Sequence, residues 1–331
     1  MFSIDCLEAI PFSLLKDRVD NMSSNKHNAT TERKARLGAI AQWAKVGVLK
    51  PRELFSIEEI FMKRVEAKTN TFFKPIQIGE LNSVEFNRQL SYLIDAFDSL
   101  PGRVDIAFDS TWKAFELETR EFAPRQNITD RLRTIVEAVD KDVIDLICSN
   151  FPVQSCEYLY KRLISDVVDK NVNYGLKNRI NYSKNNQQIC QLLEHLELQY
   201  KKGSSVTRRN GALLIRRALE GEQLKLANSS GVTFVTLGSN SKAQILISLF
   251  LYTARNERVH GSTFSPFISS AASLRTYTHP YFAFLATYYL LISLWKIKHP
   301  QVLILNQGSV ITSLKENIEI ARKILGSNWN N

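Results

Sequence analysis

The chain has 331 residues, of which 44% are hydrophobic and 23% are charged. This composition is typical of a globular protein with a sizeable core, and it excludes a wholly disordered chain. Glycine (13) and proline (9) are scarce, which disfavours collagen-like and turn-rich all-β architectures. The net charge of +10 favours a polyanionic partner such as nucleic acid or an acidic membrane surface.

The cysteines and the apolar stretches indicate a cytoplasmic protein. The four cysteines are too dispersed for a zinc site or a disulfide framework, so we expect reduced thiols. Residues 1–6 lack the basic start and apolar run of a signal peptide. The most apolar stretch, residues 281–295, is shorter than the roughly 17–25 residues of a spanning helix. It therefore predicts a buried core helix and no membrane contact. The cysteines are Cys6, Cys148, Cys156 and Cys190.

Helical periodicity dominates the first half of the chain. A capping box of the S-x-x-E type, Ser56 to Glu59, predicts one helix start, and Ser83 predicts another. Pro101-Gly102 separates two helical segments that together predict a helical hairpin. Residues 71–78 break the pattern and predict a loop or a short extended piece. The helices expected here cover residues 30–49, 56–65, 83–97 and 104–121.

The second half is also mainly helical. Residues 171–186 are rich in Asn and Lys and predict a loop. Residues 232–237 alternate and are β-branched, which predicts one short strand or an extended connector. Ser241 is expected to cap a strongly apolar helix, and Ser309 to start the last one. The helices expected here cover residues 129–148, 155–169, 186–200, 211–227, 241–260, 280–296 and 309–325.

Strands and helices do not alternate, which argues against a doubly wound sheet. The predicted fold class is all-α, or nearly so: a helical bundle with at most a short strand near 232–237. Trp43, Trp112 and Trp295 are expected in the core, and Trp329 in a frayed tail.

Several catalytic signatures are absent from the sequence. There is no glycine-rich phosphate loop, no dinucleotide fingerprint, no G-x-S-x-G and no H-E-x-x-H. The five histidines are not spaced as two ligands on one helical turn. A nucleotide-driven motor and a zinc hydrolase are therefore disfavoured, and no metal or cofactor is expected. Ser/His/Asp catalysis would leave no local signal and stays unsupported.

One constellation carries recognisable chemistry. Arg255, Asn256 and His260 follow a long apolar run and precede Gly261. An arginine can neutralise a phosphate through a bidentate fork, and a histidine can move a proton near neutral pH. Together they could cleave RNA without a metal, by attack of the ribose 2′-hydroxyl on the adjacent phosphorus. The competing interpretation is an ordinary solvated helix end, with Gly261 as its stop.

The sequence Arg255-Asn256-x-x-x-His260 resembles the R-x4-6-H motif, in its R-N-x-x-x-H form, of the HEPN superfamily of helical ribonucleases. The resemblance implies a HEPN-like core over residues 81–331, with an inserted helical segment at about 125–230 and an N-terminal helical extension over 1–80. It also implies a toxin or antiphage defence effector that cuts RNA without a metal, with an antitoxin or defence-system protein as a possible partner. Arg255 would hold the scissile phosphate, His260 would be the acid/base and Asn256 would orient them.

Helix geometry adds an expectation about assembly. Residues five apart lie about 140° round a regular helix, so Arg255 and His260 of one chain do not converge unless the helix ends before His260. Two chains related by a two-fold axis would bring a second copy of each residue. We therefore expect a homodimer or a higher even-numbered oligomer.

Other basic residues are candidates for binding the RNA backbone, or form a solvated helix face and loop. Arg275 and His279, with Tyr277 and Tyr281, line either a base-stacking groove or a packed loop. The carboxylates on the 104–121 helix, Asp105, Asp109, Glu116 and Glu118, receive no role. The RNA-backbone candidates are Lys201, Lys202, Arg208, Arg209, Arg216, Arg217 and Arg258.

Three functions follow from these patterns. The leading hypothesis is a metal-independent endoribonuclease. The first alternative is a non-catalytic HEPN-like scaffold that binds nucleic acid or a partner protein. The second is a sequence-specific DNA-binding protein, which the charge alone favours and for which no helix-turn-helix pattern is evident.

Overall fold

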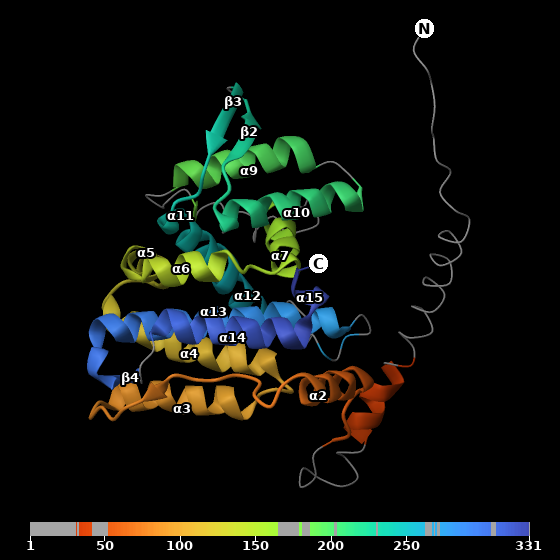
Figure 1. Ribbon diagram of the computed structural model, residues 1–331, viewed down its shortest axis with the longest axis vertical. Coiled ribbons are helices and arrows are strands. Elements are labelled where there is room, and N and C mark those ends of the chain that lie inside the picture. The colour runs from red at the N-terminus through yellow and green to blue at the C-terminus, as the bar shows by residue number, and fades with distance from the viewer. Residues whose placement is uncertain are drawn as a thin grey trace.

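Helix α13 (Thr278–Lys298) runs through the middle of the protein, and the other helices surround it (Figure 1). It belongs to a computed structural model that describes residues 31, 33–41, 52–164, 179–180, 186–201, 204–229, 231–261, 267, 269, 272–305 and 309–330. Every residue of α13 from Pro280 to Trp295 is buried, as expected for a helix that is apolar all round. Within the described chain, the helix from Leu274 to Lys298 alone is long and apolar enough to cross a membrane, but 89% of its apolar window is buried inside the protein. The expectation of a buried core helix is confirmed.

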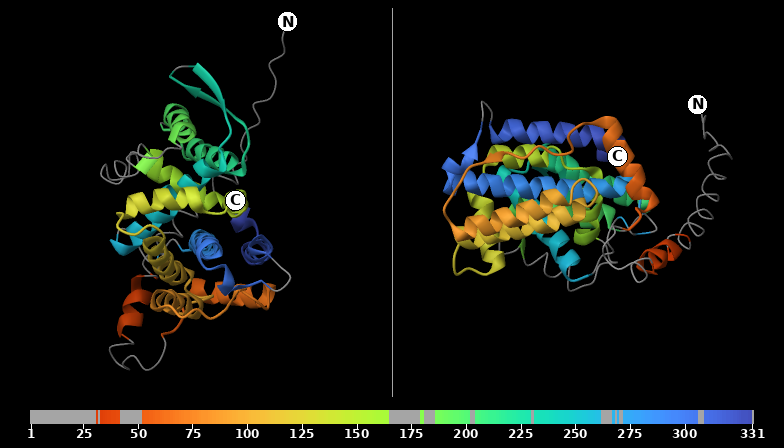
Figure 2. Two further views of the ribbon diagram at one scale, coloured as in Figure 1. Left: turned by 90° about the vertical axis from the view of Figure 1, so that its left-hand side faces the viewer. Right: turned by 90° about the horizontal axis from the view of Figure 1, so that it is seen from below.

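Below α13 lies the helical hairpin of α3 (Val84–Asp98) and α4 (Val104–Phe122) (Figures 1 and 2). The predicted hairpin is confirmed. Its predicted start is confirmed as well, since Ser83 caps α3 by accepting a hydrogen bond from the backbone N–H of Phe86. Buried polar groups tie this layer to α13. The indole N–H of Trp295 donates to Gln89 over 2.8 Å, and Gln89 donates to Glu118 over 2.9 Å.

On the other side of α13 lie α5 (Ile128–Ala138), α6 (Lys141–Cys148) and α7 (Val153–Ile164). The single helix expected over 129–148 is wrong, because it breaks in two. The carboxylate of Asp140 accepts hydrogen bonds from the backbone N–H groups of Asp142 and Val143 and starts a new helix there. The end of the helix expected over 155–169, and most of the loop expected over 171–186, lie outside the described residues.

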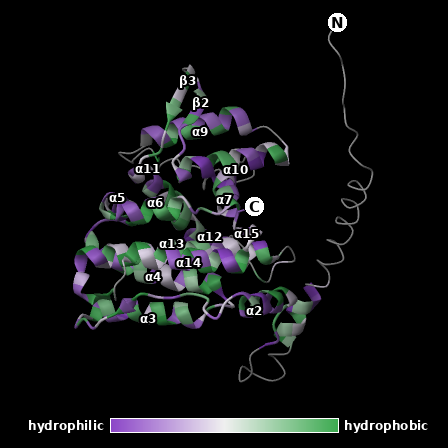
Figure 3. Cartoon of the chain, in the orientation of Figure 1, coloured by the Kyte–Doolittle hydropathy of each residue, from purple (hydrophilic) through white to green (hydrophobic). Residues whose placement is uncertain are grey.

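The outermost layer contains α9 (Asn186–Tyr200), α10 (Ser205–Glu220) and a hairpin of β2 (Leu224–Asn228) and β3 (Gly231–Val235). Both helices carry polar and apolar residues along their length (Figure 3). The helix expected over 211–227 is wrong at both ends. Gly221 has a φ of 91° and stops α10, and the chain then turns into β2.

The short strand expected near 232–237 exists, but it is not alone. β3 pairs antiparallel with β2, from Leu224 opposite Val235 to Asn228 opposite Gly231. A second two-stranded sheet joins β1 (Gln77–Ile78) to β4 (Leu303–Ile304). The prediction of at most one short strand is therefore wrong, while the mainly helical character is confirmed.

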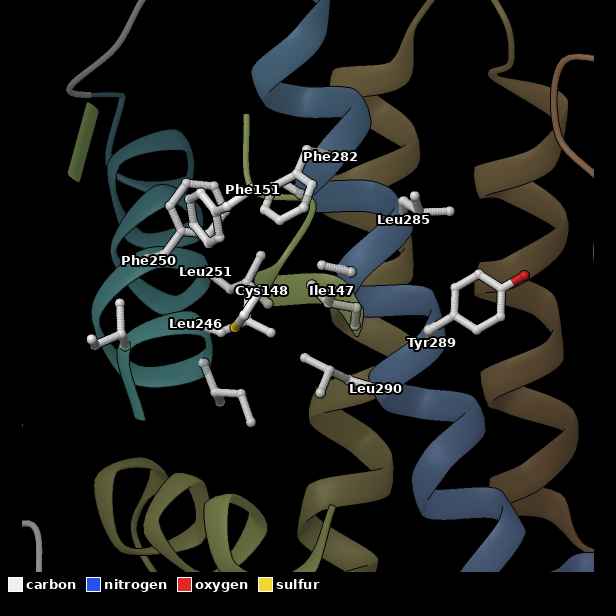
Figure 4. Close-up of a cluster of buried hydrophobic side chains, with 14 of the residues drawn as sticks. Ile147, Cys148, Phe151, Leu246, Phe250, Leu251, Phe282, Leu285, Tyr289 and Leu290 are labelled. Atoms are coloured by element: carbon white, nitrogen blue, oxygen red, sulfur yellow. The ribbon is translucent and has the colours of Figure 1, made fainter. Parts of the chain in front are cut away.

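The apolar run before the Arg255 motif forms three consecutive segments. They are α11 (Ser239–Ala243), a π-helix η1 (Gln244–Leu251) and α12 (Tyr252–Val259). The side chain of Phe250 points at Phe151 and Phe282 in the main apolar cluster (Figure 4). Ser241 does not cap this run as expected. Its hydroxyl donates to Gln188, and the helix begins two residues earlier.

Residues 56–68 and the C-terminal residues 310–330 pack against the core. In α2 (Ser56–Lys68) the capping residue differs from the expectation, because Glu58 rather than Glu59 reaches back to the backbone N–H of Phe55. At the other end Ser309 caps α14 (Val310–Leu325) as predicted. Trp329 of the short α15 (Ser327–Asn330) is buried, so its expected place in a frayed tail is wrong.

Smaller elements complete the description. Residues 33–41 are helical, and the 3-10 turns η3 (Leu274–Tyr277) and η4 (Pro300–Val302) flank α13. Trp112 and Trp295 are buried as expected, while Trp43 and Cys6 lie outside the described residues. The other three cysteines are free thiols.

The contact of α10 with α7 gives a test of the packing. A Cβ placed on Gly211 would come within 2.6 Å of the Tyr160 ring and 3.2 Å of the Tyr200 Cβ. We expect Gly211→Ala to lower the free energy of unfolding by about 1–3 kcal/mol, because overpacking outweighs the gain in helix propensity. Urea denaturation measures this value.

The matched control is Gly38→Ala, also in a helical segment, where an added Cβ meets nothing within 4 Å. That substitution should leave stability unchanged or raise it by up to about 1 kcal/mol. Equal effects of the two substitutions would show that α10 does not pack on Tyr160 as described.

Candidate functional site

The Arg255 motif lies at the end of α12, where the helix stops one residue before His260. The backbone N–H of His260 still bonds to the carbonyl of Asn256 over 2.9 Å, and Gly261 follows with a φ of 66°. Both His260 and Gly261 are exposed. Because the helix ends before His260, the separation of about 140° expected for a regular helix does not fix where its imidazole points. The left-handed Gly261 is also what an ordinary helix end requires.

Arg255 is held from two sides. Its Nη1 donates to the side-chain oxygen of Asn256 over 2.9 Å, and its Nη2 lies 3.2 Å from Glu116 on α4. About a quarter of the Arg255 side chain (26%) stays exposed. The structure thus brings Arg255 and Asn256 together. Within the described chain the His260 side chain makes no hydrogen bond or ion pair.

Glu116 is the anchor for Arg255. Burial opposes the ionisation of Glu116, but hydrogen bonds from Arg120 and Trp112 and the charge of Arg255 hold its pKa below the usual value. The carboxylate therefore stays charged at neutral pH and fixes the guanidinium beside it.

Arg258 turns toward α4 rather than toward solvent. It donates to both oxygens of Asp109 over 2.7 and 2.6 Å, and it lies 3.2 Å from the buried Asp105. Burial opposes ionisation of Asp105 as well, but hydrogen bonding and the charges of Arg103 and Arg258 lower its pKa. Three of the four carboxylates left without a role in the sequence are therefore ion-pair partners of the motif helix, whereas Glu118 pairs with Lys298 of α13.

Glu257, between these arginines, is a site residue that the sequence analysis did not single out. It is buried, accepts a hydrogen bond from the Tyr158 hydroxyl over 2.9 Å and pairs with Arg162 over 2.8 Å. Burial raises the pKa of Glu257 against the opposing effect of Arg162. Its partners Tyr158 and Arg162 are about 95 to 99 residues away in the chain, so no local sequence signal marked it.

A cavity of about 570 Å³ lies between α7, α12 and the start of α13. We refer to it as the α7–α12 cavity. Its wall combines apolar side chains with charged ones, and Arg255, Asn256 and His260 are not among its lining residues. The charged lining residues are Glu157, Lys161, Arg162, Glu257, Arg258 and Arg275.

His279 closes one wall of this cavity. Its Nδ1 lies 3.3 Å from the hydroxyl of Ser155, and its ring packs 4.6 Å from Tyr158 and 5.2 Å from Phe250. Burial lowers the pKa of His279 to about 4, and the charges of Arg258 and Arg162 act in the same direction. The imidazole is therefore neutral at physiological pH.

The four residues considered for a base-stacking groove separate in the structure. Arg275 and His279 line the α7–α12 cavity, where Arg275 pairs with Glu157 over 2.8 Å. Tyr277 and Tyr281 are buried in the core, and Tyr277 stacks on Phe61 with centroids 3.6 Å apart. The groove as predicted from these four residues is not formed.

The basic residues of α10 also divide into two groups. Arg208 and Arg209 are exposed and line a second hollow of about 590 Å³, which shares Glu157 and Lys161 with the α7–α12 cavity. Further along the helix, Arg216 pairs with Glu220 over 2.8 Å, and Arg217 pairs with Glu222 over 2.7 Å. Lys201 is exposed, and Lys202 lies outside the described residues.

Neither the arrangement of the described side chains nor comparison with known proteins assigns a metal site or a family. Among the residues that the structure describes, no group of three or more His, Cys, Asp or Glu side chains is placed to hold a metal ion. No protein-family model, curated protein or solved structure matches the chain.

The half-buried His279 predicts a pH-dependent stability. An unfolded histidine takes up a proton near pH 6.5, whereas the folded one does so only near 4. The unfolded state therefore binds more protons between these values, and stability is lost as the pH falls through them, by up to about 3 kcal/mol. We expect His279→Gln to reduce this slope. Urea denaturation from pH 7 to 4.5 compares the variant with the unaltered protein, and parallel curves would contradict the assignment.

Proposed function

We propose that the protein is a metal-independent endoribonuclease whose catalytic residues are Arg255, Asn256 and His260. The observation that carries this proposal is the end of α12. There an exposed imidazole, without a hydrogen bond in the described chain, stands five residues after an arginine that Asn256 and Glu116 hold in place. The resemblance of this sequence to the HEPN motif supports the same assignment, and a HEPN-like core is part of the proposal.

The reaction needs only proton transfer and charge neutralisation. His260 takes the proton of the ribose 2′-hydroxyl, and the oxygen attacks the adjacent phosphorus while the bond to the 5′-oxygen breaks. The protonated imidazole of His260 then gives its proton to the leaving oxygen, which yields a 5′-hydroxyl and a 2′,3′-cyclic phosphate. Arg255 stabilises the charge that builds on the phosphoryl oxygens.

Glu116 and Asn256 position Arg255 for this task. They occupy its Nη2 and Nη1, and its Nε has no hydrogen-bond partner in the described part of the chain. A phosphate oxygen can therefore approach Arg255 at Nε without displacing the two groups that hold it. Preorganised donors of this kind need little rearrangement in the transition state.

The substrate and biological role follow from the same proposal. The exposed Arg208 and Arg209 on α10 suit contacts with an RNA backbone. The resemblance suggests a toxin or antiphage defence effector acting in the cytoplasm, with an antitoxin or defence-system protein as a possible partner.

The first test of this function is RNA cleavage in the presence of EDTA. We expect the purified protein to cut RNA under these conditions and to leave 2′,3′-cyclic phosphate ends or their hydrolysed form. His260→Ala should lower the cleavage rate by about 10²- to 10⁴-fold, the usual contribution of a general acid or base. Its fold should persist because the side chain is exposed. Gel analysis of end-labelled RNA and circular dichroism measure the two effects.

His299→Ala is the control, because His299 also follows a helix, as the C-cap of α13, but packs on Phe86. It should cut RNA at the normal rate. Loss of all cutting on chelation, with recovery on adding magnesium, would reject the mechanism in favour of a metal-dependent one.

The second test concerns assembly. We expect a homodimer, or a higher even-numbered oligomer, in which Arg255 of one chain and His260 of the other serve one phosphate. Mixing inactive Arg255→Ala with inactive His260→Ala would then restore about half of the sites in each heterodimer. Light scattering gives the oligomeric state, and cleavage after mixing gives the rescue. A stable monomer that cuts RNA at full specific activity would overturn the shared site.

A non-catalytic scaffold is the second candidate, and the ion pairs between α4 and α12 favour it. Arg258 is paired with Asp109 and Asp105, and Arg255 is within reach of Glu116. These ion pairs alone would give Arg255 and Arg258 a structural role, which is to hold α12 against α4. Normal RNA cleavage by the unaltered protein and its loss in His260→Ala separate the enzyme from the scaffold.

A further inference from the structure

We infer that the α7–α12 cavity binds a small organic phosphate, at a place separate from the proposed catalytic residues. The inference goes beyond RNA cleavage, because neither Arg255 nor His260 lines this cavity. It rests on the donor groups in the wall, their charge, and the size and mixed character of the space.

Three guanidinium groups in the wall each present a free edge. Arg162, Arg258 and Arg275 all bind a carboxylate through Nη2. Their Nη1 groups have no hydrogen-bond partner in the described part of the chain. The Nε of Arg275 is also buried without a partner. A buried donor left unpaired is costly, and a ligand with several acceptor oxygens would satisfy it.

The charge of the wall matches an anion. Arg162 pairs with Glu257, Arg275 with Glu157, and Arg258 with Asp109 outside the wall. Lys161 remains as an exposed ammonium group without a described partner. Lys161 also faces the second hollow, where Arg208 and Arg209 are exposed and unpaired in the described chain. A guanidinium fork matches the geometry of a phosphate as well as that of a carboxylate.

The space is larger than inorganic phosphate requires. Its volume of about 570 Å³ lies in the usual range for small-molecule sites. The wall also includes the apolar side chains of Phe108, Ala254, Pro280 and Ala283. The ligand should therefore join a phosphate to an apolar or aromatic body.

Phenyl phosphate is a suitable probe, with phenol and inorganic phosphate as its two halves. We expect isothermal titration calorimetry of the full chain to detect phenyl phosphate, with weaker binding of inorganic phosphate and none of phenol. Arg275→Ala should reduce the affinity by about tenfold or more, as for the loss of a charge-assisted pair. Lys161→Ala, an exposed position that should not disturb folding, should reduce it several-fold.

Arg322→Ala is the control, because Arg322 lies on α14 in an exposed ion pair with Glu319. It should bind phenyl phosphate normally. Absence of phenyl phosphate binding at millimolar concentration would overturn the inference. It would also be overturned if the Arg275→Ala and Lys161→Ala variants bound phenyl phosphate as tightly as the unaltered protein. A result in which Arg275→Ala weakens only the binding of a single-stranded RNA would overturn it too, because the cavity would then belong to the RNA surface. These readouts measure binding, so they stand whether or not the protein cleaves RNA.

Discussion

The burial of α13 on all sides is the constraint on which the rest of the structure depends. A helix that is apolar all round must be covered by other elements, and here α4 covers one side while α6 and α7 pack on the other. The start of α13 then lies against α7 and α12, where His279 and Pro280 contribute to the α7–α12 cavity. The place of both candidate sites thus follows from how the central helix is covered.

The second layer of organisation is a group of buried or half-buried charges on α12. Arg255 and Arg258 face the carboxylates of α4, while Glu257 faces Arg162 of α7. Removing one member of such a pair leaves a partly buried charge without its partner. The resulting loss of folding free energy exceeds the net stabilisation that the pair provides. These contacts therefore fix the orientation of α12 between its neighbours. They contribute less to net stability than their number suggests.

Local signals made part of this fold predictable. The hydroxyls of Ser83 and Ser309 cap the helices that follow them, and both starts were read from the sequence. Asp140 caps α6 in the same local way, but the sequence was interpreted as one continuous helix across this position. The strand β2 was not predictable in this way, because its residues form a strand through pairing with β3.

The candidate site was predictable only in outline. The position of Arg255, Asn256 and His260 at the end of an apolar helix was read correctly. The partners of Arg255 and Arg258 were not, because Glu116 and Asp109 are separated from them by about 140 to 150 residues. The α7–α12 cavity could not be foreseen either, since α7, α12 and α13 bring its residues together only in the folded chain.

The ion pairs between α4 and α12 determine which substitution can separate a catalytic role from a structural one. Asp109 and Glu116 lie about two turns apart on one helix, so replacing Arg258 would disturb the support of α12 and with it the position of Arg255. A loss of activity in an Arg258 variant would therefore fit either role. Arg255 is also ambiguous, because its pairing with Glu116 is structural whatever else it does. His260 stands outside these pairs, exposed beyond the last turn of α12. Since its imidazole supports nothing in the described fold, any chemistry that depends on it can be ascribed to the imidazole itself.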